Sequence, residues 1–238
     1  MEERLLAWFS HNGRDLPWRR TRDPYAILVS EVMCQQTQAE RVAPRWRRWL
    51  ARWPTVETLA AAAAGDVIRE WQGLGYNRRA LALHRAAQQV AAAGWPDDLT
   101  ELPGVGRYTA DAIACFAFGR PVLPVDVNVR RVAERTGQAF SPAAAQALMD
   151  LGKTVCLARV PRCGICPLAA VCPSRGRRFE PRRRQTPYEG SFRQRRAQTL
   201  RLVAAGRRRL ADLDADAVRS LARDGLVRVE GEVVCLPA

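Results

Sequence analysis

Four cysteines fall within seventeen residues of one another, and they constrain the fold of this chain more than any other feature. They stand at Cys156, Cys163, Cys166 and Cys172, in the spacing C-x6-C-x2-C-x5-C. The N-terminus carries acidic residues early and lacks the apolar stretch of a signal peptide, so we expect a cytoplasmic protein, in a compartment where disulfides are rare. Thiols at this density in that setting predict a metal centre.

Two kinds of metal centre share the two-residue gap between Cys163 and Cys166. Structural zinc sites usually pair two such short gaps, whereas iron–sulfur clusters accept ligands that are more widely spread. This chain has one short gap, and the other two intervals are six and five residues long. The spacing therefore favours an iron–sulfur cluster over zinc.

The rest of the chain is predicted to be mostly helical. Apolar residues recur at helical spacing in residues 24–53, interpreted as two helices broken at Pro44, and again in 54–75 and 76–95, interpreted as one helix each. Strand-like alternation occurs only in residues 226–236, with Gly231 in a predicted turn. No run of eighteen apolar residues is present, so no membrane span is expected.

Basic residues dominate the charge and gather in one part of the chain. The net charge is +14, which favours a polyanionic partner. Residues 175–209 hold thirteen arginines and only two acids, so this stretch is either a solvated linker or a segment that contacts phosphates. We place a basic linker at 176–190, between a domain at 1–175 and a smaller one at 191–238.

The string LPGVGRYT, residues 102–109, places two glycines just before a predicted helix. Glycine permits positive φ and a close backbone approach, and the first turn of a helix offers free N–H groups to an anion. A lone GxG is weak evidence for such a site, because tight turns between helices often need glycine. The whole string is that of a helix-hairpin-helix module, which binds a DNA phosphate without reading sequence. The residues expected at the DNA are Leu102, Gly104, Val105, Gly106 and Thr109.

Two carboxylates stand in surroundings that favour a catalytic role. Glu31 lies in the apolar helical run YAILVSEVM, where burial would favour the protonated form that a general acid needs. Asp126 lies between Val125 and Val127 at the head of an arginine-bearing helix, where it can cap that helix. The alternatives are a buried structural glutamate and an aspartate that only caps.

Together these motifs resemble the helix-hairpin-helix DNA glycosylases of the endonuclease III superfamily, and within it the MutY-type adenine glycosylases. The resemblance covers residues 4–175 and is carried by DLPWRRTRDPY, SEVMCQQTQ, GLGYNRRALALH, LPGVGRYTADAI, VDVNVRRV and QALMDLGKTVC. It implies an all-α, two-lobed fold, with a six-helix barrel and a lobe whose loop 156–172 holds a [4Fe–4S] cluster on the four cysteines. It also implies a monomer that binds double-stranded DNA containing a mispair, in the bacterial nucleoid.

The resemblance assigns roles to individual residues. Glu31 would protonate the departing adenine, and Asp126 would stabilise the positive charge that develops on the sugar. Asn128 and Tyr108 would orient the aspartate. Because bifunctional relatives carry a Schiff-base lysine where Tyr108 stands, the resemblance implies base removal without strand cleavage. Further positions are implied near the substrate: Gln36 and Tyr76 in the base stack, and Trp18, Arg19 and Gln146 near the adenine pocket.

The C-terminal end departs from the pattern of full-length MutY proteins. Those proteins carry a Nudix-like domain that recognises 8-oxoguanine, whereas about fifty residues follow the linker here. We expect these residues to form a small α+β, winged-helix-like piece that adds mainly non-specific DNA affinity.

Three functions fit these motifs. The leading one is removal of adenine opposite 8-oxoguanine or guanine. The alternative is removal of thymine or uracil opposite guanine, because relatives with that activity share the tyrosine, the aspartate and the cluster; SEVMCQQTQ and GLGYNRRA favour adenine. A non-catalytic DNA-binding cluster protein is disfavoured because both carboxylates are present.

Overall fold

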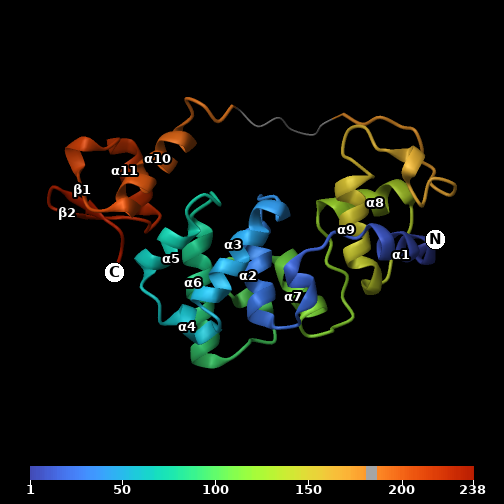
Figure 1. Cartoon of the computed structure of the whole chain (residues 1–238), viewed down its shortest axis with the longest axis horizontal. Helices are drawn as coiled ribbons and strands as arrows, with labels where there is room; N and C mark the ends of the chain where they lie inside the picture. The colour runs from blue at the N-terminus through green and yellow to red at the C-terminus, as the bar shows by residue number, and fades with distance from the viewer. Residues whose placement is uncertain (181–186) are drawn as a thin grey trace. The chain divides into compact units, whose positions relative to one another are not determined.

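The structure is a computed structural model of the chain, and it describes residues 1–180 and 187–238 (Figure 1). It is mostly helical with a small sheet near the C-terminus, as predicted. The chain divides into two compact units, residues 1–27 with 106–184 and residues 28–105 with 185–238. Part of the predicted linker, 181–186, lies outside the described residues. None of the helices in the described ranges has the length and hydrophobicity that a bilayer crossing requires.

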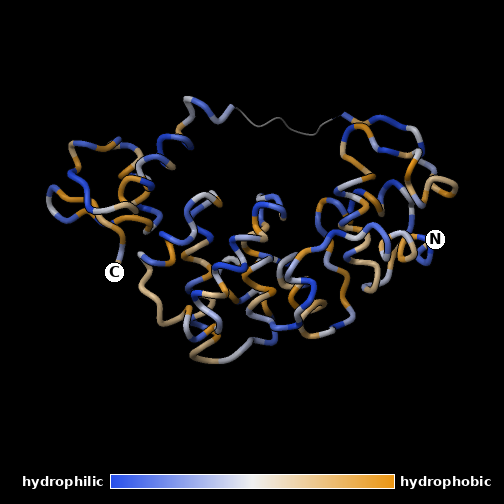
Figure 2. Tube along the Cα trace, viewed as in Figure 1, coloured by the Kyte–Doolittle hydropathy of each residue, from blue (hydrophilic) through white to orange (hydrophobic). Residues whose placement is uncertain are grey.

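Hydrophobic and hydrophilic residues alternate along the helices, as Figure 2 shows, so most helices have one face to bury. The helix α2 (Pro24–Cys34) is the exception, because every residue from Tyr25 to Met33 is buried. A helix that is apolar on nearly all sides belongs in a core, and Glu31 is placed inside this one.

The first unit is built on α1 (Glu2–Asn12), α7 (Arg107–Phe116), α8 (Val127–Thr136) and α9 (Ala145–Thr154). Its core joins Leu5 of α1 and Val132 of α8 to Leu148 of α9. The helices α8 and α9 approach closely because Gly152 has no side chain: a Cβ there would lie 2.6 Å from the Cβ of Asn128. The helices α8 and α9 are therefore closely packed, and Asp126 lies at the N-terminus of α8.

The second unit contains α3 (Ala39–Arg52), α4 (Val56–Ala60), α5 (Ala64–Trp71) and α6 (Arg78–Ala93), together with most of α2. Three tryptophans mark its core. The ring centroid of Trp49 lies 4.7 Å from that of Trp53 and 5.6 Å from that of Trp71, both in edge-on packing.

Two predicted helix boundaries are wrong. Pro44 lies inside α3, and the chain breaks instead at residues 35–38, where Gln36 has a φ of 56°. Val42, Trp46 and Trp49 are buried at helical spacing, and this packing holds α3 together across the proline. Residues 54–75 form two helices, because residues 61–63 interrupt the helical run between α4 and α5.

The C-terminal elements are α10 (Phe192–Ala205), α11 (Ala215–Arg223) and the strands β1 (Arg208–Arg209), β2 (Arg228–Glu230) and β3 (Val233–Cys235). The strands form an antiparallel sheet in the order β1-β3-β2. Gly231, with a φ of 59°, lies in the turn between β2 and β3, as predicted. Leu200, Val218 and Val234 of this piece share one hydrophobic cluster with Ile68 of α5. The C-terminal elements are therefore packed on the helices of their own unit.

Candidate active site and cysteine loop

Asp126 caps α8, and its carboxylate is held by three hydrogen bonds. The backbone N–H groups of Asn128 and Val129 donate to Oδ1 over 2.8 and 2.7 Å, and the side-chain amide of Asn128 donates to Oδ2 over 2.7 Å. The capping role predicted for this aspartate is confirmed. Asp126 itself is half-buried, whereas the flanking Val125 and Val127 are 39% and 74% exposed.

A chain of hydrogen bonds connects Asp126 to the cysteine loop. Arg131 donates to the side-chain oxygen of Asn128 over 2.7 Å and to the backbone carbonyl of Cys156 over 2.8 Å. It also donates to the carbonyl of Gly152 on α9. The hydrogen bond from the Asn128 side chain to Asp126 is thus connected, through Arg131, to the backbone at the start of the cysteine loop.

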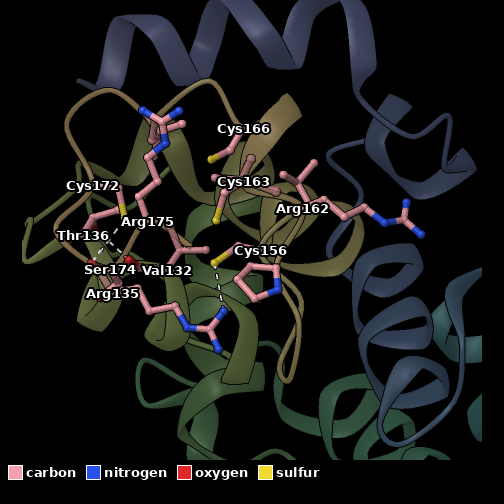
Figure 3. A pocket seen from close by; sticks show the side chains of 15 residues that line it. Val132, Arg135, Thr136, Cys156, Arg162, Cys163, Cys166, Cys172, Ser174 and Arg175 are labelled. Carbon is pink, nitrogen blue, oxygen red and sulfur yellow. Dashed lines mark hydrogen bonds between the residues drawn. The ribbon is translucent and has the colours of Figure 1, made fainter. Parts of the chain in front are cut away.

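The four cysteines line one pocket, shown in Figure 3. Burial raises the pKa of the Cys166 thiol, and the neighbouring Cys156, Cys163 and Cys172 raise it further. Among the described residues, no group of three or more His, Cys, Asp or Glu side chains is arranged closely enough to hold one metal ion. The four thiols nevertheless line the same pocket, and four thiolates are the donor set of an iron–sulfur cluster.

Arg135, one turn after Arg131 on α8, holds the first part of this loop. It donates to the carbonyls of Leu157 and Ala158 over 2.7 and 2.6 Å and lies 3.4 Å from the Cys156 sulfur. Its guanidinium also stacks 3.6 Å from the centroid of the Phe179 ring. Arg131 and Arg135 thus face the cysteine loop from the same side of α8.

Asp150 of α9 is a buried carboxylate with two arginine partners. Arg19 contacts both of its oxygens at 2.8 Å, and the side chain of Arg14 donates to it over 2.7 Å. Burial opposes ionisation of Asp150, but these hydrogen bonds and charges outweigh it and lower its pKa. The fork of Arg19 is therefore occupied by Asp150, and its guanidinium lies 5.3 Å from the centroid of the Phe9 ring.

The hairpin has the conformation that its glycines predict. Gly104 has a φ of 79°, and a Cβ there would lie 2.7 Å from the Cβ of Ala82. The side chains of Leu102 and Val105 are buried, whereas both glycines are exposed. No side chain caps α7 at Gly106, the residue at which the helix begins.

Two loops of the second unit carry strained residues, and Arg79 holds both loops. Within the described ranges, Gln36 and Tyr76 are the only residues other than glycine with positive φ, at 56° and 47°. Such a conformation costs about 1–3 kcal/mol per residue and persists only where neighbouring contacts enforce it. Arg79 donates to the carbonyls of Val32 and Met33 at the end of α2, and to those of Gln35, Leu74 and Gly75 in the two loops. Burial lowers the pKa of its guanidinium to about 10, so it stays charged at neutral pH.

A family model of the HhH-GPD superfamily, described as base excision DNA repair proteins, matches residues 29–154, more than half of the chain. This chain belongs to the HhH-GPD superfamily. Among curated relatives, the adenine DNA glycosylase of Mycobacterium tuberculosis is 44% identical, over 84% of this chain and 77% of the relative. The human adenine DNA glycosylase is 39% identical, over 73% of this chain and 39% of the relative.

Solved structures of HhH-GPD proteins share the fold of this chain. A thermostable thymine-DNA glycosylase matches with a TM-score of 0.65 and 26% identity, over 72% of this chain and 93% of that one. A non-covalent endonuclease III–DNA complex matches with a TM-score of 0.63 and 23% identity, over 72% of this chain and 92% of that one. These similarities confirm the predicted fold class.

The residues predicted for the site of this HhH-GPD chain fall in both units. In the first, Asp126 and Asn128 are in contact, and Tyr108 and Gln146 are half-buried in the first turns of α7 and α9. In the second, Glu31 is buried in α2, and Gln36 and Tyr76 are exposed on the two strained loops. The buried Thr109 follows Tyr108 in α7.

Sequence reasoning missed three arginines that organise these sites. Arg131 and Arg135 follow Asp126 by five and nine residues on one helix, and that spacing was the available signal. Arg79 had no comparable signal, because an arginine at the start of an amphipathic helix is usually solvated.

Proposed function

We propose that this HhH-GPD protein is a monofunctional adenine DNA glycosylase that removes adenine mispaired with 8-oxoguanine or guanine in double-stranded DNA. The observation that carries the proposal is the Asp126 carboxylate, held by three hydrogen bonds at the head of α8. The similarity of this chain to an adenine DNA glycosylase, over 84% of its length, supports adenine as the base. We further propose that it acts as a monomer in the bacterial cytoplasm, at the nucleoid.

The proposed chemistry is hydrolysis of the bond between the base and C1′ of the sugar. As that bond breaks, the sugar gains oxocarbenium character, and the Asp126 carboxylate stabilises the positive charge. Glu31 donates a proton to N7 of adenine, so that the base leaves as a neutral molecule. Water adds to C1′ and gives up a proton to the Glu31 carboxylate, which restores the acid and completes an abasic site. Asn128 positions Asp126, and Tyr108 is proposed to stand beside it.

The same site disfavours strand cleavage. A β-lyase needs an amine that forms a Schiff base with the opened sugar. Position 108 is a tyrosine, and the only lysine, Lys153, is exposed in the last turn of α9. We therefore propose that the product is an intact strand with an abasic site.

We propose that Cys156, Cys163, Cys166 and Cys172 hold a [4Fe–4S] cluster. When bound, the cluster would offer iron atoms to the four cysteine thiolates, and these bonds would hold the loop 156–172 together. Arg135 and Arg131 contact the beginning of that loop, so the chain's own residues connect it to α8.

The remaining contacts with DNA are proposed by position. The exposed hairpin backbone around Gly104 and Gly106 would bind a phosphate, together with Leu102, Val105 and Thr109 through their main chain. Gln36 and Tyr76, on strained loops, would enter the base stack. Trp18, Arg19 and Gln146 would border the extruded adenine.

A panel of mispaired duplexes tests the proposal. Adenine opposite 8-oxoguanine and adenine opposite guanine should release free adenine, and strands should break only after alkali. Borohydride should trap no protein–DNA adduct. Nicking without alkali, or an adduct, would contradict the monofunctional assignment.

The second candidate is removal of thymine or uracil opposite guanine, which the similarity to a thymine-DNA glycosylase favours. The same panel includes these mispairs. Release of thymine or uracil with no release of adenine would replace the proposed substrate with this one.

A further inference from the structure

A groove of about 1160 Å³ lies within the second unit, between the two strained loops and the C-terminal helix α10. Gln36 and Tyr76 line one side, and Ala197 and Arg201 of α10 line the other. Because the C-terminal elements share a hydrophobic cluster with Ile68 of α5, the two walls belong to one packed body. Both walls of the groove are therefore held in place by the hydrophobic core of this unit.

The groove is strongly basic. Among the described residues that line it, none is acidic and six are arginines: Arg41, Arg78, Arg79, Arg193, Arg196 and Arg201. Four of the six are engaged elsewhere in the protein. Arg79 binds backbone carbonyls, Arg196 and Arg78 pair with Asp224 at 2.7 and 3.7 Å, and Arg193 donates to the carbonyl of Pro187. Arg41 and Arg201 are exposed, and neither forms an ion pair within the described ranges. These two present their charge to whatever enters the groove.

Three lining residues of α10, Arg193, Ala197 and Arg201, are spaced four residues apart and so occupy one face of the helix. Arg193 and Arg201 are eight residues apart, or about 12 Å along the helix at 1.5 Å per residue. One DNA strand carries a phosphate every 3.4 Å of duplex axis, so this face would span about three to four phosphates if α10 lay parallel to that axis. The small side chain of Ala197 leaves room between the two arginines.

Tyr76 gives the groove an aromatic surface. It is 49% exposed, and Arg79 lies 5.5 Å from its ring centroid. A basic groove with an exposed aromatic ring is the combination that binds a strand by its backbone and stacks a displaced base, at about 1–3 kcal/mol per stacked base. An acidic peptide could pair with the arginines, but it has no base to stack on the exposed ring of Tyr76.

We propose that this groove binds the sugar–phosphate backbone of one DNA strand, with Arg41 on one wall and Arg201 of α10 on the other. The C-terminal piece then forms one wall of this groove, and the arginines of α10 that line it neutralise phosphates. The inference rests on the proposed function in taking DNA as the partner, but it concerns binding and requires no base removal.

The first test compares single arginines on the same protein. Arg201→Ala and Arg41→Ala remove a groove charge, whereas Arg195→Ala removes the same charge from α10 at a residue that lies outside the groove and pairs with Asp214. DNA affinity is measured against salt on an undamaged duplex. The slope of log affinity against log salt is negative, and each groove variant should make it shallower by about 0.9 for each phosphate that the variant no longer neutralises. Arg195→Ala should leave the slope at its wild-type value, and equal effects of Arg195→Ala and Arg201→Ala would overturn the proposal.

The second test locates the strand. Neutral methylphosphonates replace three consecutive phosphates at successive positions along each strand of the duplex. At one position on one strand the wild type should lose affinity, and Arg201→Ala should be insensitive there. If no position distinguishes the wild type from Arg201→Ala, the groove does not hold a backbone. Melting temperatures of all variants show whether any loss comes from unfolding.

The two proposals fail separately. If the duplex panel shows no base release while the groove variants change the salt slope, only the glycosylase assignment falls. If adenine is released and Arg201→Ala binds DNA like Arg195→Ala, only the groove falls.

Discussion

The side-chain amide of Asn128 donates to Oδ2 of Asp126 over 2.7 Å, and its carbonyl oxygen accepts a 2.7 Å hydrogen bond from Arg131. Asn128 therefore connects the Asp126 carboxylate, through Arg131, to the backbone at Cys156, and we propose that it positions this carboxylate.

Replacing Asn128 should slow base removal without weakening DNA binding. A hydrogen bond to a charged group contributes about 1.5–3 kcal/mol, so Asn128→Ala is expected to slow single-turnover adenine release by roughly ten- to a hundredfold. If Asn128 acts through Asp126, the double variant Asp126→Asn/Asn128→Ala should be no slower than Asp126→Asn alone. Asn12→Ala, at an exposed asparagine of the same unit, is the control. Additive losses in the double variant would contradict the positioning role.

The cysteine loop should bind iron and sulfide. Cys166→Ser removes one of the four thiols that line the pocket and should lower bound iron and the visible absorbance of the purified protein. Cys115→Ser changes a half-buried thiol that does not line the pocket and should leave the iron content unchanged. Zinc without iron in the wild-type protein would show that the spacing had been misread.

The buried carboxylate of Asp150 should matter for stability in a pH-dependent way. Asp150→Asn leaves Arg14 and Arg19 without their partner and should lower the free energy of unfolding by about 3–5 kcal/mol at pH 7. The pKa of Asp150 is lowered in the folded protein, so its contribution is complete above the unfolded-state pKa of about 3.9. That contribution is lost as the pH falls through the lower, folded-state pKa.

Urea denaturation at several pH values measures this effect. The difference between wild type and Asp150→Asn should be constant near neutral pH and shrink in acid. Asp15→Asn removes an exposed partner of Arg20 and should cost at most about 1 kcal/mol. A difference that grows as the pH falls would contradict the assignment.

The sequence was most informative where a local interaction decides the structure. Asp126 was predictable as a helix cap because the residue type and the start of an apolar-periodic helix are both visible in the sequence. Gly104 was predictable as a hairpin residue for a similar reason, and its positive φ agrees. The helical character of most of the chain followed from apolar periodicity.

Contacts between distant segments could not be predicted in this way. Arg131 reaches Asn128 and Cys156 together because Gly152 lets α9 approach α8, and nothing near Arg131 in the sequence indicates that approach. The break at Gln36 was missed because glutamine does not favour positive φ. Arg79, from the start of α6, holds that loop by its carbonyls, and the break depends on this distant contact.

The most direct test compares two aspartates that cap helices. Asp126 caps α8 and Asp214 caps α11, each accepting hydrogen bonds from backbone N–H groups. Asparagine caps helices about as well as aspartate, so Asp126→Asn and Asp214→Asn should both fold and melt close to the wild type. On a duplex with adenine opposite 8-oxoguanine, single-turnover adenine release should fall by roughly 10²–10³ in Asp126→Asn, the scale of other charge-stabilising groups, and stay at the wild-type rate in Asp214→Asn. Wild-type adenine release by a folded Asp126→Asn protein would contradict the account.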